Sequence, residues 1–217
     1  MTAATATAVM RTPGQWPWLL LSAGQTAYAP DTGGQAEDLA NLRECRDGNG
    51  DRFSRIIARH QDRVAAMMWR FTRNPQAHEE LTQEVFVQAW QSLGTYRERA
   101  PFVNWLARIA TRTGYRYWQQ QKRERSRVPL ELKGLEDKLA DEGVAPEPTE
   151  AAELLYSLLS QLPPRDRLVL TLRYLEDLSV AETARRTGWS SALVKVQTLR
   201  ARSKLEKLMQ NAWGMQR

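Results

Sequence analysis

The sequence has 217 residues, enough for one or two small domains, and its 42% hydrophobic and 26% charged residues are ordinary for a globular protein. The one cysteine, Cys45, excludes a disulfide framework, and the two histidines, His60 and His78, lie too far apart to suggest a metal site. The longest apolar run, residues 18–23, is far shorter than the roughly 20 residues that span a bilayer. We therefore expect no metal, no cofactor and no insertion into a membrane.

The net charge of +6 is concentrated in two stretches. Residues 108–127 hold seven basic side chains against one acid, and residues 195–217 hold six against one. Two separate basic blocks indicate two places where a polyanion such as nucleic acid could bind, although solvated helix faces would give the same pattern.

Residues 1–50 do not read as a packed domain, because Ala/Thr repeats are followed by scattered prolines and glycines. We expect a disordered extension, or a start codon assigned too far upstream. A secretory signal starting at Met10 is the alternative, with residues 16–23 as its apolar stretch, but Pro17 interrupts that stretch.

From residue 51 to 127 the spacing of apolar residues predicts a domain of three helices. The first would end before Asn74-Pro75, and the second before Gly94. The inward residues of the first two helices are Phe53, Ile56, Ile57, Val64, Met67, Met68 and Phe71, then Leu81, Val85, Phe86, Ala89, Trp90 and Leu93. The other face of the second helix is mostly acidic and amide, which by itself is typical of a solvated surface.

The third helix, from Pro101 to about Arg125, carries arginines along one side with aromatic residues between them. Guanidinium groups bind phosphates, and aromatic rings stack on unpaired bases. The competing interpretation is that Tyr117 and Trp118 belong to the core. Gly114 within this helix predicts a bend or a close approach of another segment.

Residues 128–150 are rich in acids and proline, which predicts a flexible acidic linker. Beyond it, leucine stripes precede Ser179-Val180-Ala181-Glu182, a capping box that begins a short helix. Gly188 then ends that helix, and a basic helix follows from Ser191 to about Met209. This order is typical of a helix-turn-helix, whose second helix enters the major groove, although a generic helical hairpin is the alternative.

Over residues 51–210 the sequence resembles the extracytoplasmic-function (ECF) sigma factors, small bacterial transcription initiation factors. Residues 77–90 are similar to the polymerase-docking helix of the family's region 2, and residues 102–110 to its promoter-melting helix. Leu162-Pro163, Leu172-Arg173-Tyr174, the capping-box segment through Ala184 and Arg200-Ala201-Arg202 are similar to region 4.

The resemblance implies an all-α fold of two small helical domains: region 2 over residues 51–127 and region 4 over residues 151–217. The linker 128–150 would thread toward the active-site cleft of the polymerase. Implied partners are core RNA polymerase, promoter DNA and an anti-sigma factor. The chain would act in the cytoplasm and would not be an enzyme.

The resemblance also assigns surfaces. Implied polymerase contacts are Glu80, Leu81, Gln83, Glu84 and Val87. Implied contacts to the single-stranded −10 promoter element are Tyr96, Arg97, Arg108, Arg112, Tyr115, Arg116, Gln119 and Arg123. Implied contacts to the duplex −35 element are Ser191, Ala192, Lys195, Val196, Arg200 and Arg202.

Several positions depart from the family pattern, among them Arg112, Arg116, Thr183 and the pair Val196-Gln197. They affect the expected promoter preference rather than the class. The alternative function is a free-standing helix-turn-helix regulator, which would dimerise on a two-fold site and need no polymerase-docking face. A nuclease or helicase is disfavoured, because the sequence has no phosphate loop and no catalytic carboxylate–histidine set.

Overall fold

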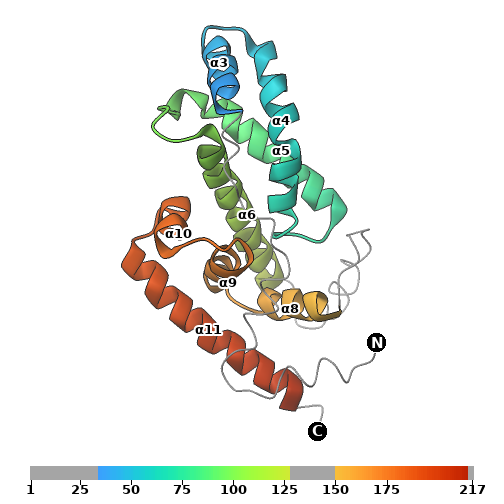
Figure 1. Cartoon of the computed structure of the whole chain (residues 1–217). Coiled ribbons are helices and arrows are strands. Elements are labelled where there is room, and N and C mark those ends of the chain that lie inside the picture. The colour runs from blue at the N-terminus through green and yellow to red at the C-terminus, as the bar shows by residue number, and fades with distance from the viewer. Residues whose placement is uncertain (1–33, 128–149, 215–217) are drawn as a thin grey trace. The chain divides into compact units, whose positions relative to one another are not determined.

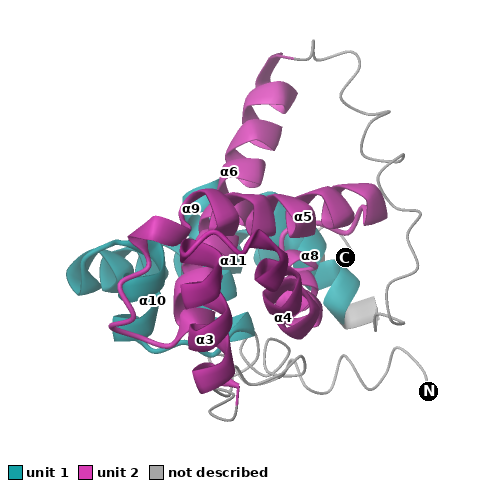
Figure 2. Cartoon of the chain, turned by 90° about the horizontal axis from the view of Figure 1, so that it is seen from above, with its two compact units in different colours: residues 1–28, 147–217 teal, residues 29–146 magenta. Residues whose placement is uncertain are grey.

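The computed structural model describes residues 34–127 and 150–214, and every regular element in these two stretches is helical. The two stretches belong to separate compact units (Figure 2). The expected all-α fold with two helical domains is confirmed. The proposed linker and the proposed signal sequence lie outside the described residues.

The unit that contains residues 34–127 is built from four α-helices and two short 3₁₀ turns (Figure 1). In chain order they are α3 (Gln35–Arg46), η2 (Gly50–Arg52), α4 (Phe53–Met68), α5 (Pro75–Gln91), η3 (Leu93–Thr95) and α6 (Phe102–Arg127). Among the fully buried side chains of its core are Leu42, Ile56, Met68, Val85 and Phe102. Asn74 caps α5 by accepting from the Ala77 amide at 2.9 Å, and Pro75 occupies the first turn, where its missing N–H costs no hydrogen bond.

Helix α3 corrects the expectation that residues 1–50 form a disordered extension, for the part of that segment that is described. It packs on α4 and α6 through Leu42 and Cys45, and it also buries Asp38 and Asn41. The helix has only a weak apolar stripe, and polar contacts provide much of its attachment to the rest of the unit. An argument from hydrophobic periodicity therefore missed it.

The turn between α4 and α5 shows why Gly114 stands within α6. Helix α4 ends at Met68 rather than continuing to Phe71, and the Phe71 ring then lies directly against Gly114. The Trp118 indole donates to the Phe71 carbonyl at 2.6 Å, and the two rings lie 4.5 Å apart. The close approach predicted at Gly114 is confirmed, and Trp118 is a core residue.

The second unit contains α8 (Glu150–Ser160), α9 (Pro164–Leu170), the π-turn η5 (Thr171–Leu175), α10 (Val180–Thr187) and α11 (Ser191–Gly214). Leucines of α8 and α9 pack against Val194, Ala201 and Leu205 of α11. The capping box is present, since the Ser179 hydroxyl accepts from the Glu182 amide while the Glu182 carboxylate accepts from the Ser179 amide. Gly188 ends α10 with a φ of 78°, a left-handed conformation that favours glycine.

The described helices do not include one with the length and apolar character needed to cross a membrane. Within residues 34–127 and 150–214 no three His, Cys, Asp or Glu side chains gather as a metal site would require.

Candidate nucleic-acid interface

One side of α6 carries the predicted stripe of basic residues. The stripe consists of four exposed arginines, Arg108, Arg112, Arg116 and Arg123. They are spaced by four, four and seven residues, which keeps them on one face of the helix. Tyr115 and Gln119, half-buried, lie beside them. The opposite face supplies Leu106, Ala110 and Trp118 to the core. The C-terminal turns of α6 extend away from the other helices of its unit (Figure 2).

The electrostatics of this stripe favour an anionic ligand. Arg108 and Arg112 make no ion pair with any residue that the structure describes. Arg116 lies 3.9 Å from Glu84 of α5, a long contact between two half-exposed side chains, which contributes little to stability. The guanidinium groups are therefore available to phosphates.

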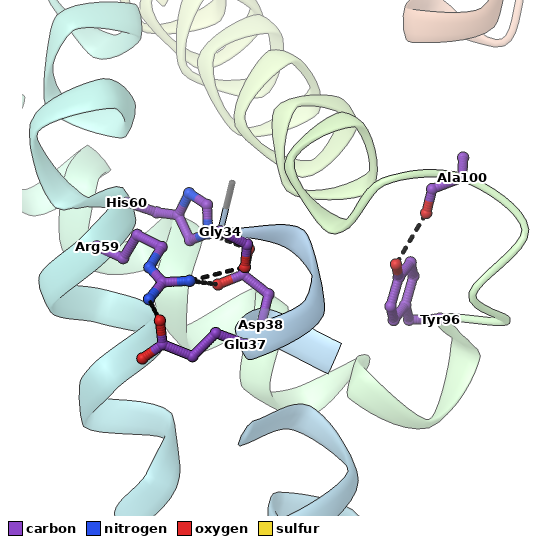
Figure 3. A network of polar contacts seen from close by, with 7 residues as sticks. All are labelled: Gly34, Glu37, Asp38, Arg59, His60, Tyr96 and Ala100. Atoms are coloured by element: carbon purple, nitrogen blue, oxygen red, sulfur yellow. Dashed lines mark hydrogen bonds and ion pairs between the residues drawn. The ribbon is translucent and has the colours of Figure 1, made fainter. Parts of the chain in front are cut away.

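The segment just before α6 differs from the prediction at Tyr96. This side chain is 4% exposed: its ring packs against Phe102 and Trp105, and its hydroxyl donates to the Ala100 carbonyl at 2.8 Å (Figure 3). The pKa of the Tyr96 hydroxyl is raised, chiefly by burial. Its ring is thus part of the core and is not presented to a base, whereas Arg97 is exposed as expected.

The face of α5 predicted to dock polymerase is only partly as expected. Glu80, Gln83, Glu84 and Val87 point outward, and Val87 is 47% exposed. Leu81, predicted as part of this face, is buried: it lies one residue away from the polar stripe and faces the core. Trp90, expected inside, is 44% exposed and meets Phe53 edge-on with ring centroids 5.1 Å apart.

The outer face of α11 holds the other predicted contacts. Ser191, Ala192, Lys195, Val196 and Arg200 are exposed, and Arg202 is half-buried. The structure adds Leu199, which is 70% exposed between Lys195 and Arg200. The sequence analysis did not single out Leu199, although its spacing from the buried Val194 and Ala201 would have placed it outside.

The position of α11 is held by a buried carboxylate of α9. Asp166 is 1% exposed and accepts from the Gln197 amide group and, at 2.6 Å, from the Lys204 ammonium. Gln197, noted above as a departure from the family pattern, therefore faces the inside of the unit. Lys204 is engaged by Asp166, whereas Lys195 and Arg200 are exposed and form no ion pair with a residue that the structure describes.

Comparisons with known proteins agree with this geometry. Residues 56–124 match the family model described as Sigma-70 region 2, and residues 152–205 match that of Sigma-70 region 4. The chain is 31% identical over 163 residues to the Probable RNA polymerase sigma factor RfaY of Xanthomonas campestris, which covers 70% of this chain but 38% of that protein. It is 24% identical over 179 residues to the ECF RNA polymerase sigma factor SigW of Bacillus subtilis, covering 78% of this chain and 95% of that protein.

A solved structure is similar in fold. The sigma factor RpoE of Bartonella quintana, in complex with the anti-sigma factor NepR, matches with a TM-score of 0.51 and 20% identity, over 73% of this chain and 96% of that one. The region 2 model covers α5 and most of the helices α4 and α6, and so includes the arginine stripe of α6. The region 4 model covers the helix-turn-helix, which includes most of α11. The chain therefore belongs to the extracytoplasmic-function family of RNA polymerase sigma factors.

Proposed function

We propose that this chain binds core RNA polymerase and directs it to promoters, with the unit of residues 34–127 opening the −10 element and the unit of residues 150–214 reading the −35 element. The observation that carries the proposal is the presence of two exposed cationic faces, α6 and α11, one on each family-matched unit. The chain lends binding energy rather than catalysis, and acts in the cytoplasm beside the polymerase.

At the −10 element, the stripe on α6 binds the displaced strand. Arg108, Arg112 and Arg116 neutralise successive phosphates, and the half-buried ring of Tyr115 offers a surface for an unpaired base. Base–aromatic stacking contributes about 1–3 kcal/mol per base, which favours the open over the closed duplex. Tyr96 takes no direct part in this surface because its ring is buried.

At the −35 element, the N-terminal turns of α11 enter the major groove. Ser191 and Ala192 are small enough for close approach, and Lys195 reaches a base edge one turn further on. The exposed apolar side chains of Val196 and Leu199 suit the methyl group of thymine. Arg200, farther along the helix, meets the phosphate backbone and sets the register of the helix rather than its sequence preference.

Core polymerase binds the outer face of α5. Exchanging Glu80 and Glu84 for lysine reverses one exposed and one half-exposed charge, so folding changes by no more than about 0.5 kcal/mol, whereas like-charge contacts at an interface cost several kcal/mol. We expect the double variant to lose affinity for core polymerase in a pull-down while its circular dichroism is unchanged. Asp62→Lys, an exposed charge reversal on α4, is the matched control. Retention of the double variant at the control level would contradict this docking face.

We further propose an anti-sigma factor as a regulatory partner. The support is the similarity in fold between this chain and a sigma factor that was solved in complex with an anti-sigma factor. Such a partner would compete with core polymerase, so adding it to the chain should release polymerase in the same pull-down.

A further inference from the structure

Helix α3 lies outside the region matched by the family model, yet both of its ends are tied into the unit. At the first end, the buried Asp38 carboxylate lies 2.8 Å from Nε2 of His60 and 3.1 Å from the Arg59 guanidinium, both on α4 (Figure 3). Arg59 also donates to the Gly34 carbonyl at 2.7 Å and pairs with Glu37. These contacts fix the start of α3 against α4.

The last turn of α3 holds the loop of residues 93–100, more than forty residues further along the chain. Arg46 donates to the carbonyls of Leu93, at 3.3 Å, and Tyr96, and it pairs with the Glu98 carboxylate at 3.0 Å. Arg43 pairs with the other oxygen of Glu98 at 2.7 Å. The hydrogen bond from Arg43 is the largest of the effects that lower the pKa of Glu98.

These contacts define the shape of the loop. Glu98 has a φ of 57°, a left-handed conformation that non-glycine residues adopt only when the surroundings favour it. The two arginines hold its side chain from one direction. The Tyr96 ring is fixed in the core, with the Arg46 guanidinium 5.8 Å from its centroid. With Tyr96 and Glu98 both held, Arg97 and Arg99 are left exposed at the start of the α6 stripe.

We infer that α3 is a brace for the 93–100 loop and that Arg46 is a positioning residue for capture of the unpaired −10 strand. A loop that is ordered before binding does not lose its conformational entropy when the DNA arrives, so affinity rises without a new contact. Arg46 achieves this because its planar, five-donor guanidinium engages two carbonyls and a carboxylate together. The inference rests on the proposed −10 function of this unit.

The test compares holoenzymes reconstituted with variants of the full chain. The probe is fluorescent single-stranded DNA, selected from a random pool by the wild-type holoenzyme. We expect Arg46→Ala to weaken binding of this DNA about tenfold and to speed hydrogen exchange of the 93–100 amides. Arg46→Lys retains one charge-assisted contact and should recover part of both losses. Affinity for core polymerase and hydrogen exchange in α5 should not change.

The matched control is Glu44→Ala, which removes an ion pair between α3 and Arg52, 2.5 Å long, that does not involve the loop. The brace would be overturned if Arg46→Ala speeds hydrogen exchange of the 93–100 amides without weakening binding of the single-stranded DNA. It would also be overturned if Glu44→Ala weakens DNA binding as much as Arg46→Ala does. Arg112→Ala separates this result from the proposed function. If Arg112→Ala also leaves single-strand binding unchanged, the assignment of the −10 surface fails; if only Arg112→Ala weakens binding, the brace alone fails.

Discussion

Gly114 of α6 offers a quantitative test of the packing that positions the arginine stripe. A Cβ atom at this position would lie 2.3 Å from Cγ and Cδ1 of the Phe71 ring and 2.5 Å from Cδ2. Favourable carbon–carbon contacts begin near about 3.5 Å, so the ring would have to retreat by more than about 1 Å. Phe71 is itself buried and is held by the indole of Trp118, so it has little room to move.

Gly114→Ala should therefore destabilise the unit although alanine is the better helix former. Overpacking a well-filled core costs about 1–3 kcal/mol, and alanine returns about 1 kcal/mol of helix propensity. The difference is about 0–2 kcal/mol, and because the ring is buried against the Trp118 indole we expect a loss in the upper half of that range. Hydrogen exchange read by mass spectrometry measures this loss in peptides of α6, separately from residues 150–214.

Two further variants make the result decisive. Gly94→Ala adds the same methyl group where no atom lies within 4 Å, and should change stability by no more than about 0.5 kcal/mol. In a Phe71→Leu background, the added methyl group should cost less than it does beside phenylalanine. A stabilisation of about 1 kcal/mol by Gly114→Ala alone, as expected for an unobstructed helix glycine, would refute the close packing.

Four other variants test the second unit. Asp166→Ala should cost about 1–3 kcal/mol in urea unfolding, because it leaves the buried Gln197 amide without its acceptor; an unchanged midpoint would contradict the role of this carboxylate. Hydrogen bonding from Ser179 lowers the pKa of Glu182 below its ordinary value, so the stability that this carboxylate contributes is present at neutral pH and is lost as the pH falls through the lowered pKa. Glu182→Gln should remove this acid-dependent loss of α10 amide protection, and equal acid sensitivity would argue against it. In binding to single-base variants of the −35 duplex at two salt concentrations, Arg200→Ala should weaken all sites equally and lower the salt slope by about 1. Lys195→Ala should relax preference at one base pair by about 1–3 kcal/mol, and equal losses on every variant would show that it binds only phosphate.

Much of the fold was predictable, because local signals and tertiary packing agree there. The capping box at Ser179 and the terminating Gly188 each act within a few residues, and both appear as expected. The arginine stripe on α6 was also predictable, since helical spacing alone places its members on one side.

The remaining features depend on contacts between distant residues, which spacing does not reveal. Helix α3 is attached through Asp38 and Arg46, whose partners lie on α4 and in the 93–100 loop. Tyr96 was assigned to DNA through the family resemblance, but its ring packs against its neighbours Phe102 and Trp105.

The most direct test of the central claim is transcription by core polymerase reconstituted with the full chain. We expect transcripts that start downstream of two shared sequence elements, and none from core polymerase alone. Arg112→Ala should reduce initiation on duplex templates while sparing templates whose −10 segment is already unpaired, and Lys195→Ala should change the preferred upstream element. Specific DNA binding by a dimer of the chain, with no effect on where polymerase starts, would contradict the account and favour a free-standing regulator.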